Sequence, residues 1–522
     1  MPDDNGRPPF QSGDLDTVRD QLRSHPAVEQ ADVRLAAGGS LTAYVVPAHS
    51  PQGDAAGVAG GVVPPDTETV DNWRSVFDDC YRGTRITTTG ADTGNRPEPE
   101  RSAASETELT AGWTDSFTGR PIPADDMAEW VATTVARILA LEPTCLLEMG
   151  AGTGLLMSDL TAQGELREYT ATDLSPESVR VLTTVAARLR RTRPAPLSLA
   201  VHEARATTPA PPSLHGGYDV AVLNSVAQYF PSTRYLEDVL HRIVPVMRPG
   251  GHIFLGDLRN EDLFEEFACI KHHRRATPGT PPQRIARQIT RELRRDGELL
   301  LSPGYLHGLP ARLGAITAVE TAPRRGAACN EMTLFRYDAV LHVGCEAPAT
   351  EPDWHDGTKL TLPVLAHQLA CETGAFGYRS LVNARLRDAQ RLRRTYLPEH
   401  SAPASAEAVA LDPEEVCTLA EGYGWTPRLR WTPGADCGEF DLWLAPPDGT
   451  CEHFRFAIPW QDPDPGQDLG ASPRHRMFPP RAEHDRKTEL TSFLTRRLPE
   501  RLVPCDMVFT ERLPCLAGHS HR

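Results

Sequence analysis

The chain contains 522 residues, of which 40% are apolar and 24% charged, a balance typical of a globular protein with two or three domains. Its formal net charge of −16 argues against a nucleic-acid partner, because phosphate binding requires a basic surface. No apolar run approaches the roughly 20 residues needed to cross a bilayer, so we expect no membrane partner.

The first residues and the cysteines indicate the compartment. The opening MPDDNGRPPFQSGD lacks the basic and apolar regions of a signal peptide, and we therefore expect a cytoplasmic protein. The eleven cysteines include no C-x-x-C pair and no metal-ligand spacing. We expect reduced thiols and no metal site.

Residues 1–48 are predicted to form a small α/β piece. DLDTVRDQLRSHPAV (14–28) has helical spacing, and the next segment, ADVRLAAGGSLTAYVVPA, has the pattern of a hairpin with Gly38 and Gly39 at its turn. Residues 49–69 are rich in glycine, proline and alanine, which predicts a linker.

A helix is predicted from Val70 to Tyr81, and strands and helices alternate from Met127 to about Gly344. Strands are expected at CLLEMG, EYTATD, YDVAVLN and HIFLGD, with helices between them. This order predicts a parallel sheet covered by helices on both faces. Two later runs, ITAVETA and MTLFRYDAVLHVG, suit a closing antiparallel pair of strands.

The rest of the chain is predicted to contain an extension, a second linker and a closing element. Residues 346–460 show helical spacing at Leu362–Cys371 and Val409–Tyr423, and strands at FDLWLAP and EHFRFAI. Residues 461–486 are charged and rich in proline, as in a linker. Residues 487–522 contain an amphipathic helix followed by a strand.

The strongest functional signal is LLEMGAGTG (146–154), in which a buried strand turns through glycines into a helix. Glycine lets the backbone approach a bound ligand closely, and the free N–H groups at the helix start attract a carboxylate or phosphate. The residues expected to contact a cofactor here are Glu148, Gly150, Ala151, Gly152 and Gly154.

A second strand sharpens this signal. EYTATD ends at Asp173, about twenty residues further on, where an acid can accept both ribose hydroxyls of an adenosyl cofactor, and Leu174 follows it. The first loop opens with an acid and lacks a third glycine serving a pyrophosphate. The spacing therefore favours S-adenosylmethionine over NAD.

Longer segments resemble the methyltransferase domains of nonribosomal peptide synthetases. The similar segments are NWRSVFDDCY (72–81), GWTDSFTGRPIPADDMAEW (112–130), LNSVAQYFPSTRYLEDVL (223–240), MRPGGHIFLGDLRN (247–260), NEMTLFRYDAVLH (330–342) and LVNARL (381–386). The first two resemble the lid of those domains. The resemblance implies a class I S-adenosylmethionine methyltransferase with a Rossmann-like α/β fold and a mostly parallel seven-stranded sheet in residues 70–345, with residues 346–460 as its C-terminal part.

The two ends of the chain resemble the small α+β C-terminal subdomain of an adenylation domain. Residues 14–28 align with its E-L-G-E-I-E…H-P-A-V region, and ELTSFLTRRLPERLVPCDMVFTERLP resembles its closing part. In synthetases with interrupted adenylation domains, the backbone N-methylating insert lies at this position. The resemblance thus implies that residues 1–48 and 487–522 are two halves of one subdomain, and it favours an α-amine as the methyl acceptor.

The sequence also departs from that pattern. The large adenylation subdomain has no counterpart, and Asp16 stands where the family has an early glycine. The family's closing P-N-G-K motif is also missing, and His519 lies nearest to the position of its lysine. We therefore expect that the chain does not activate amino acids itself.

Resemblance and topology together place the reaction at the carboxyl ends of the strands. Asn224 and Ser225 end the fourth strand and are expected to face the methionine part of the cofactor, with Tyr81 and Trp113 covering it from the lid. An amine must lose a proton before it can attack a methyl group, so an acceptor is needed nearby. The candidate catalytic residues are Gln228, Tyr229, Asp257, Asn330 and Glu331, with Glu331 as the preferred proton acceptor.

Plainer interpretations of these residues stay open. Tyr229 can cap the sheet, Asp257 can cap a turn, and Glu331 can form a surface ion pair with Arg336. The expected partner is an aminoacyl-loaded peptidyl carrier protein, with other synthetase modules as further partners. The alternative functions are O- or S-methylation of a side chain, methylation of a free small molecule, and non-catalytic docking of a carrier or synthetase partner.

Overall fold

The computed structural model describes residues 12–25, 28–35, 41–47, 65–81, 113–192, 197–344, 353–398, 409–432, 438–447, 490, 493–499, 502–504 and 506–509. Chain contacts divide the protein into two compact units, one of residues 1–69 and 477–522 and one of residues 70–476. The predicted turn at Gly38 and Gly39 and the predicted strand at residues 452–458 lie outside the described residues.

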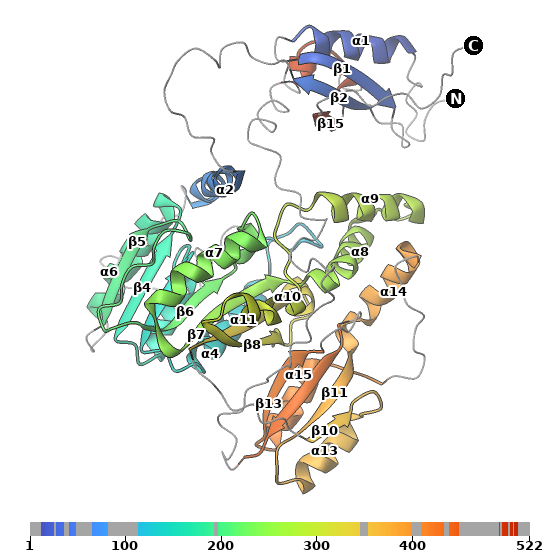
Figure 1. The fold of residues 1–522 in the computed structure, drawn as a ribbon. Helices are drawn as coiled ribbons and strands as arrows, with labels where there is room; N and C mark the ends of the chain where they lie inside the picture. Colours follow the sequence, from blue (N-terminus) through green and yellow to red (C-terminus); the bar gives the residue numbers. More distant parts are fainter. Residues whose placement is uncertain are drawn as a thin grey trace, which may run out of the picture. The chain divides into compact units, whose positions relative to one another are not determined.

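The larger unit is built on a seven-stranded sheet in the order β5-β4-β3-β6-β7-β9-β8 (Figure 1). The strands from β5 to β7 are parallel, whereas β9 runs antiparallel to both β7 and β8. This confirms the predicted class I methyltransferase fold. The strands are β3 (Cys145–Met149), β4 (Glu168–Asp173), β5 (Ser198–Glu203), β6 (Tyr218–Asn224), β7 (Met247–Arg259), β8 (Ile316–Pro323) and β9 (Arg336–Val343).

Helices cover both faces of this sheet, as the alternation of strands and helices predicts. Successive residues of β3 point to opposite sides: Leu146 belongs to one apolar core and Leu147 to the other. The first core also contains apolar residues of α4 (Ala124–Leu139), α5 (Leu155–Gln163) and α6 (Pro176–Thr192). The second contains those of α7 (Thr233–Ile243), α8 (Phe264–Arg275), α9 (Pro282–Arg295), α10 (Pro303–His307) and α11 (Leu309–Arg312).

Two predictions near the end of this sheet were wrong in detail. β7 continues to Arg259, so Asp257 does not close the strand but lies in a bulge, with φ of +59° and a register shift between Leu255 and Leu258. Residues 332–335, which were predicted to begin the last strand, belong instead to a short helix, α12 (Glu331–Phe335). The Asn330 side chain caps this helix by accepting from backbone N–H groups.

The helix predicted to begin at Val70 begins earlier, as α2 (Pro65–Tyr81). Proline suits the first turn of a helix, because its fixed φ is already helical and its missing N–H has no partner there. The helix leads into the larger unit, in which Val70 is buried.

Residues 353–447 form a second sheet within the larger unit, in the order β10-β11-β14-β13, with β12 paired to β11. Its elements are β10 (Asp353–Asp356), α13 (Leu362–Cys371), β11 (Phe376–Asn383), α14 (Arg387–Tyr396), β12 (Ala410–Leu411), α15 (Pro413–Gly422), β13 (Thr426–Trp431) and β14 (Phe440–Ala445). Leu386 and Trp431 belong to the core under the main sheet. Arg393 of α14 also donates to Glu265 and Glu266 of α8, at 2.9 and 3.0 Å.

The smaller unit is a three-stranded sheet with a helix against it. α1 (Ser12–Arg23) precedes β1 (Val28–Leu35), which pairs antiparallel with β2 (Leu41–Pro47). β2 also pairs, in parallel, with β15 (Asp506–Phe509) from the other end of the chain. Its core combines Val18, Leu22, Val33, Val45, Leu490, Leu494 and Met507. The predicted first helix and closing strand are confirmed.

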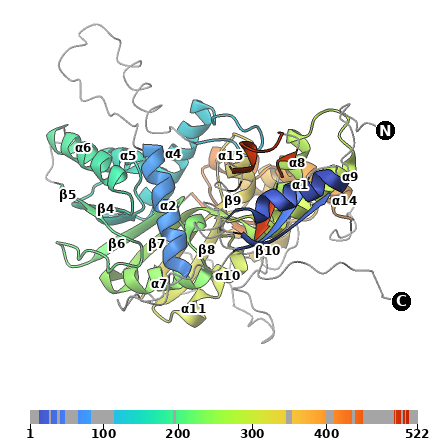
Figure 2. The ribbon, with the colours of Figure 1, turned by 90° about the horizontal axis from the view of Figure 1, so that it is seen from above.

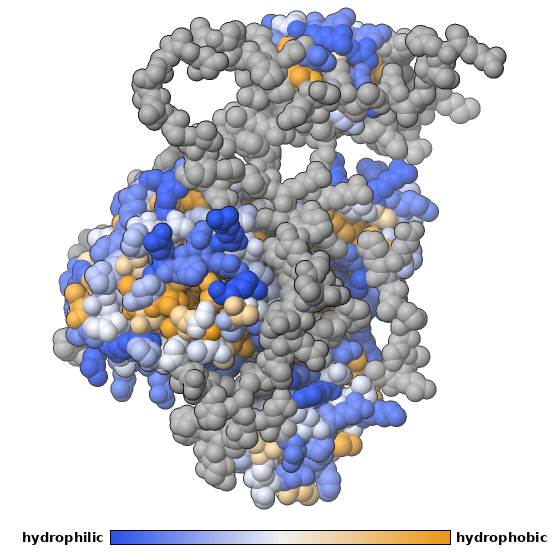
Figure 3. Space-filling view, in the orientation of Figure 1, coloured by the Kyte–Doolittle hydropathy of each residue, from blue (hydrophilic) through white to orange (hydrophobic). Residues whose placement is uncertain are grey.

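The described surface of the larger unit mixes hydrophilic areas with a hydrophobic patch, which is orange in the space-filling view (Figure 3). The exposed residues of α9 include Arg284, Arg287 and Arg291. None of the helices in the described ranges combines the length and apolar character needed to cross a membrane.

Candidate active site

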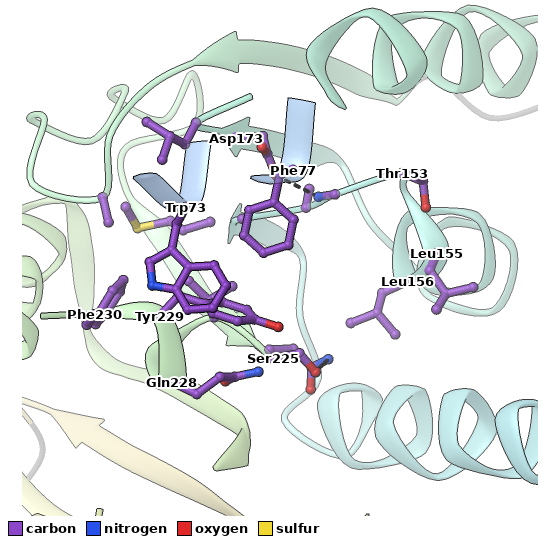
Figure 4. Close-up of a pocket in the computed structure, with 18 of the residues that line it drawn as sticks. Trp73, Phe77, Thr153, Leu155, Leu156, Asp173, Ser225, Gln228, Tyr229 and Phe230 are labelled. Atoms are coloured by element: carbon purple, nitrogen blue, oxygen red, sulfur yellow. Dashed lines mark hydrogen bonds between the residues drawn. The ribbon is translucent and has the colours of Figure 1, made fainter. Parts of the chain in front are cut away.

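A cavity of about 410 Å³ lies at the carboxyl ends of β3, β4 and β6, a size typical of small-molecule pockets (Figure 4). The chain passes from β3 to β4 and β5 on one side and then returns to β6 on the other. The crevice between β3 and β6 is therefore the point where the strand order reverses. Ligands of open α/β sheets bind at such points.

The glycine turn after β3 forms the floor of this pocket. Gly150 and Gly152 have φ of +74° and +56°, a region that favours glycine. A Cβ atom on Gly150 would lie 2.4 Å from Cγ2 of Val226, so the turn also needs glycine for space. The Gly152 N–H donates to Oδ2 of Asp173 at 2.8 Å, which joins the turn to the end of β4.

Two carboxylates stand at the ends of neighbouring strands, as predicted. Asp173 is buried and accepts from the N–H groups of Gly152 and Ser175, and burial raises its pKa although these two donors oppose the shift. Glu148 accepts a hydrogen bond from the Tyr169 hydroxyl. Burial raises the pKa of Glu148 to about 7, and the charge of Asp173 adds to the shift. The pocket thus holds one acid that titrates near neutrality.

Helix α2 covers the pocket with aromatic side chains. Figure 2 shows α2 lying between α5 and α7, and Figure 4 shows Trp73 and Phe77 above Tyr229. The ring centroids of Trp73 and Phe77 lie 4.5 and 5.0 Å from that of Tyr229. Arg74 pairs with Glu203 of β5 at 2.9 Å, which holds the helix to the sheet. The sequence analysis predicted the cover by Tyr81 but not the part that Trp73 and Phe77 take in it.

A buried polar network borders the other side of the pocket. Asp257 accepts from the Ser225 hydroxyl and from Nη1 of Arg336, each at 2.7 Å. Nη2 of Arg336 donates to Glu331 at 3.1 Å, and the Ser116 N–H donates to the same carboxylate at 2.9 Å. Burial alone lowers the pKa of Arg336, but Asp257 and Glu331 outweigh it and hold that pKa above its usual value. The ion pair of Glu331 and Arg336 is therefore present but largely buried, not on the surface.

Three side chains that line the pocket, between helix α2 and the buried polar network, offer hydrogen-bonding groups to a ligand. Oδ1 of Asn224 and Oε1 of Gln228 are buried and accept no hydrogen bond from the residues that the structure describes. A buried acceptor without a partner costs about 1–3 kcal/mol, so a ligand donor here is favoured. Burial raises the pKa of Tyr229 to about 12, and its hydroxyl therefore stays protonated at neutral pH.

The cavity brings together most of the predicted site residues. Those that line it are Tyr81, Trp113, Glu148, Gly150, Ala151, Gly152, Asp173, Leu174, Asn224, Ser225, Gln228, Tyr229 and Glu331. Gly154, Asn330 and Asp257 lie outside its lining. Gly154 precedes α5 and packs against Leu182, Asn330 caps α12, and Asp257 is fully buried behind Ser225. The sequence analysis missed Trp73, Phe77, Glu298 and Arg336 as lining residues.

The charges of the lining suit S-adenosylmethionine, the predicted cofactor. Four carboxylates and one guanidinium line the cavity, which favours a positively charged ligand such as a sulfonium. Asp173 at the end of β4 fits a ribose, and the unpartnered oxygen of Asn224 fits an ammonium group. The glycine turn leaves the space that a nucleoside needs. The residues present therefore fit the cofactor.

Sequence comparisons point to a methyltransferase domain. Residues 147–253 match a family described as a methyltransferase domain. Chondramide synthase cmdD of Chondromyces crocatus is 30% identical over 543 residues, which span 96% of this chain and 13% of the synthase. Nonribosomal peptide synthetase asqK of Emericella nidulans is 29% identical over 86% of this chain and 17% of its own length. The solved magnesium protoporphyrin IX methyltransferase from Synechocystis is 12% identical, with a TM-score of 0.31 over 53% of this chain and 98% of that one.

Proposed function

Because this chain carries a class I S-adenosylmethionine methyltransferase domain related to those within nonribosomal peptide synthetases, we propose that it methylates the α-amine of an amino acid held on a carrier protein. The observation that carries the proposal is the extent of the similarity. It covers 96% of this chain, including both flanks, within a synthase of which the chain spans 13%. A chain related to one part of a peptide synthetase is expected to act on substrates that the synthetase carries.

The donor half of the pocket is the part between β3, β4 and α2. S-adenosylmethionine supplies an activated methyl group there. Asp173 and the turn at Gly150 and Gly152 would hold its adenosine, and Asn224 would accept from its amino group. Trp73 and Phe77 exclude water from this half, which strengthens the electrostatic contacts inside it.

The acceptor half contains groups that can prepare an amine. An ammonium has no lone pair, so its proton must pass to an acceptor before methyl transfer. Glu331 takes this role in our proposal, because each oxygen that already binds Arg336 or Ser116 keeps a further lone pair. Oε1 of Gln228 accepts a second N–H of the amine. Tyr229 orients the acceptor as a donor, since its raised pKa prevents it from acting as a base at neutral pH.

The flanking unit fits a role in partner contacts. Residues 1–48 and 487–522 together form one small three-stranded sheet with a helix packed against it. This agrees with the resemblance to an adenylation C-terminal subdomain. We propose that this unit docks the chain to a carrier protein or to other synthetase modules, which would deliver the acceptor on a phosphopantetheine arm.

The test is intact-mass spectrometry of a panel of aminoacyl-loaded carrier proteins incubated with the full chain and S-adenosylmethionine. We expect the mass of one methylene group to be added to at least one loaded carrier, and fragmentation to place it on the α-nitrogen. Asp173→Ala should abolish the gain. Glu165→Ala removes an exposed carboxylate at the amino ends of the strands, away from the pocket, and should leave the mass gain unchanged.

Other outcomes separate the alternatives. A methyl group found on oxygen or sulfur would replace the N-methyl assignment. No gain on any carrier, together with calorimetric binding of S-adenosylmethionine, would indicate a free small-molecule acceptor. No binding heat at all would indicate a non-catalytic docking module.

A further inference from the structure

A carboxylate that the sequence analysis did not single out reaches the acceptor half of the pocket from the loop between α9 and α10. Glu298 lines the cavity there. Backbone contacts fix the loop directly after it: the Leu299 N–H donates to the Gln228 carbonyl at 2.7 Å, and the Leu301 N–H donates to the Arg259 carbonyl at 3.0 Å. Backbone contacts therefore hold Glu298 beside Gln228.

Arg259 holds the Glu298 side chain in place. Its guanidinium lies over the rings of Phe264 and Phe267, at 5.3 and 5.7 Å, and is 9% exposed. It binds both oxygens of Asp296, at 2.7 and 2.9 Å, and contacts Oε2 of Glu298 at 3.0 Å. A planar guanidinium makes these contacts at once, whereas a lysine cannot.

The arrangement leaves this part of the pocket with surplus negative charge. Arg259 shares its single positive charge between Asp296, which accepts two short hydrogen bonds, and Glu298, so the three groups together keep a net negative charge. The Oε1 atom of Glu298 has no hydrogen-bonding partner among the described residues, in contrast to Glu331, whose oxygens bind Arg336 and Ser116. The side chain of Glu298 is 35% exposed and that of Glu331 only 6%. Glu298 is therefore the more solvent-accessible of the two carboxylates.

We propose that Glu298 captures the positively charged amino group of the acceptor and makes the pocket selective for amines over hydroxyls, with Arg259 as its positioning residue. This inference rests on the proposed function and adds the basis of its substrate choice. A cationic amine gains a charge-assisted hydrogen bond from Oε1, whereas a hydroxyl gains only a weaker neutral one. Glu298 is thus a recognition group, and proton removal stays with Glu331.

The experiment compares two acceptors on the same carrier, an aminoacyl group and the corresponding hydroxyacyl group. In the wild-type chain we expect a lower KM, or inhibition constant, for the aminoacyl form. Glu298→Gln keeps the shape and the contact with Arg259 but removes the charge. It should raise the aminoacyl value on the order of tenfold, leave the hydroxyacyl value unchanged, and change kcat by less than about threefold. Cofactor affinity, measured by calorimetry, should stay the same.

Matched variants make the result specific. Glu298→Asp keeps the charge and should recover part of the aminoacyl preference, and Glu165→Gln removes an exposed acid elsewhere and should behave as wild type. If Glu298→Gln keeps the wild-type ratio between the two acceptors, the inference is wrong even though methyl transfer is real. If the wild-type chain methylates no loaded carrier, the proposed function itself fails. The two failures are therefore distinguishable.

Discussion

Replacing Gly150 with alanine tests whether the turn after β3 needs glycine for both conformation and space. The residue has φ of +74°, and a Cβ atom there would lie 2.4 Å from Cγ2 of Val226. A left-handed conformation costs an alanine about 1–2 kcal/mol. Forcing a methyl group into packed space costs about 1–3 kcal/mol more, since valine has a stiff χ1 and cannot turn away cheaply. We expect Gly150→Ala to lower the free energy of unfolding by about 2–5 kcal/mol.

Tryptophan fluorescence during urea unfolding measures this change in the larger unit alone. All eight tryptophans lie from Trp73 to Trp460, within residues 70–476. Val226→Ala removes the overlapping methyl groups but not the backbone strain. In that background, Gly150→Ala should cost only about 1–2 kcal/mol, which gives a coupling energy of about 1–3 kcal/mol between the two sites. Additive effects, with a coupling below about 0.5 kcal/mol, would refute the steric argument.

Three further predictions concern acidic and basic groups. Asp173→Asn replaces one of the oxygens that accept from Gly152 and Ser175, so calorimetry should show S-adenosylmethionine binding on the order of tenfold weaker or worse. The pKa of Glu148 is about 7 in the fold against an ordinary 4.5. Between these two pH values the native state therefore keeps a proton on this carboxyl group that the unfolded chain has lost. Stability should therefore fall by up to about 3 kcal/mol as the pH rises from 4.5 through 7, and urea midpoints at pH 5 and 8 should show no such slope in Glu148→Gln. Arg324→Met removes one partner of the buried Asp338 carboxylate and should lower the free energy of unfolding by about 3 kcal/mol. Arg391→Met, in an exposed ion pair, should change that free energy little. Equal effects of the two variants in urea unfolding would contradict this reasoning.

Local patterns in the sequence predicted the donor half of the site. A short apolar strand followed by glycines, and a second strand ending in an acid, place Glu148 and Asp173 at neighbouring strand ends, because parallel strands bring their carboxyl ends to one edge. Topology together with the resemblance to synthetase methyltransferase domains placed Asn224 and Ser225 beside them. Glu148 and Asp173 follow from period and turn chemistry alone.

The acceptor half depends on contacts that no local pattern reveals. Glu298 reaches the pocket only because Arg259 and the backbone of Gln228 hold its loop, and nothing in the intervening sequence indicates that pairing. The bulge that buries Asp257 likewise depends on its pairing with the last strands. Asn330 is different: the capping pattern that it forms with Thr333 is visible in the sequence and could have shown its structural role.

The pairing of β2 with both β1 and β15 sets an order of events during folding. β15 follows β2 by about 460 residues, so closing the small sheet means closing a very long loop. A ribosome delivers the residues of the methyltransferase domain before those of β15, and domains generally fold as they emerge. Once that domain has folded, most of the loop has already lost its conformational freedom, and the closing strand finds β2 at lower entropic cost. The stability of the small sheet is therefore linked to that of the domain inserted within it, although the two have separate cores.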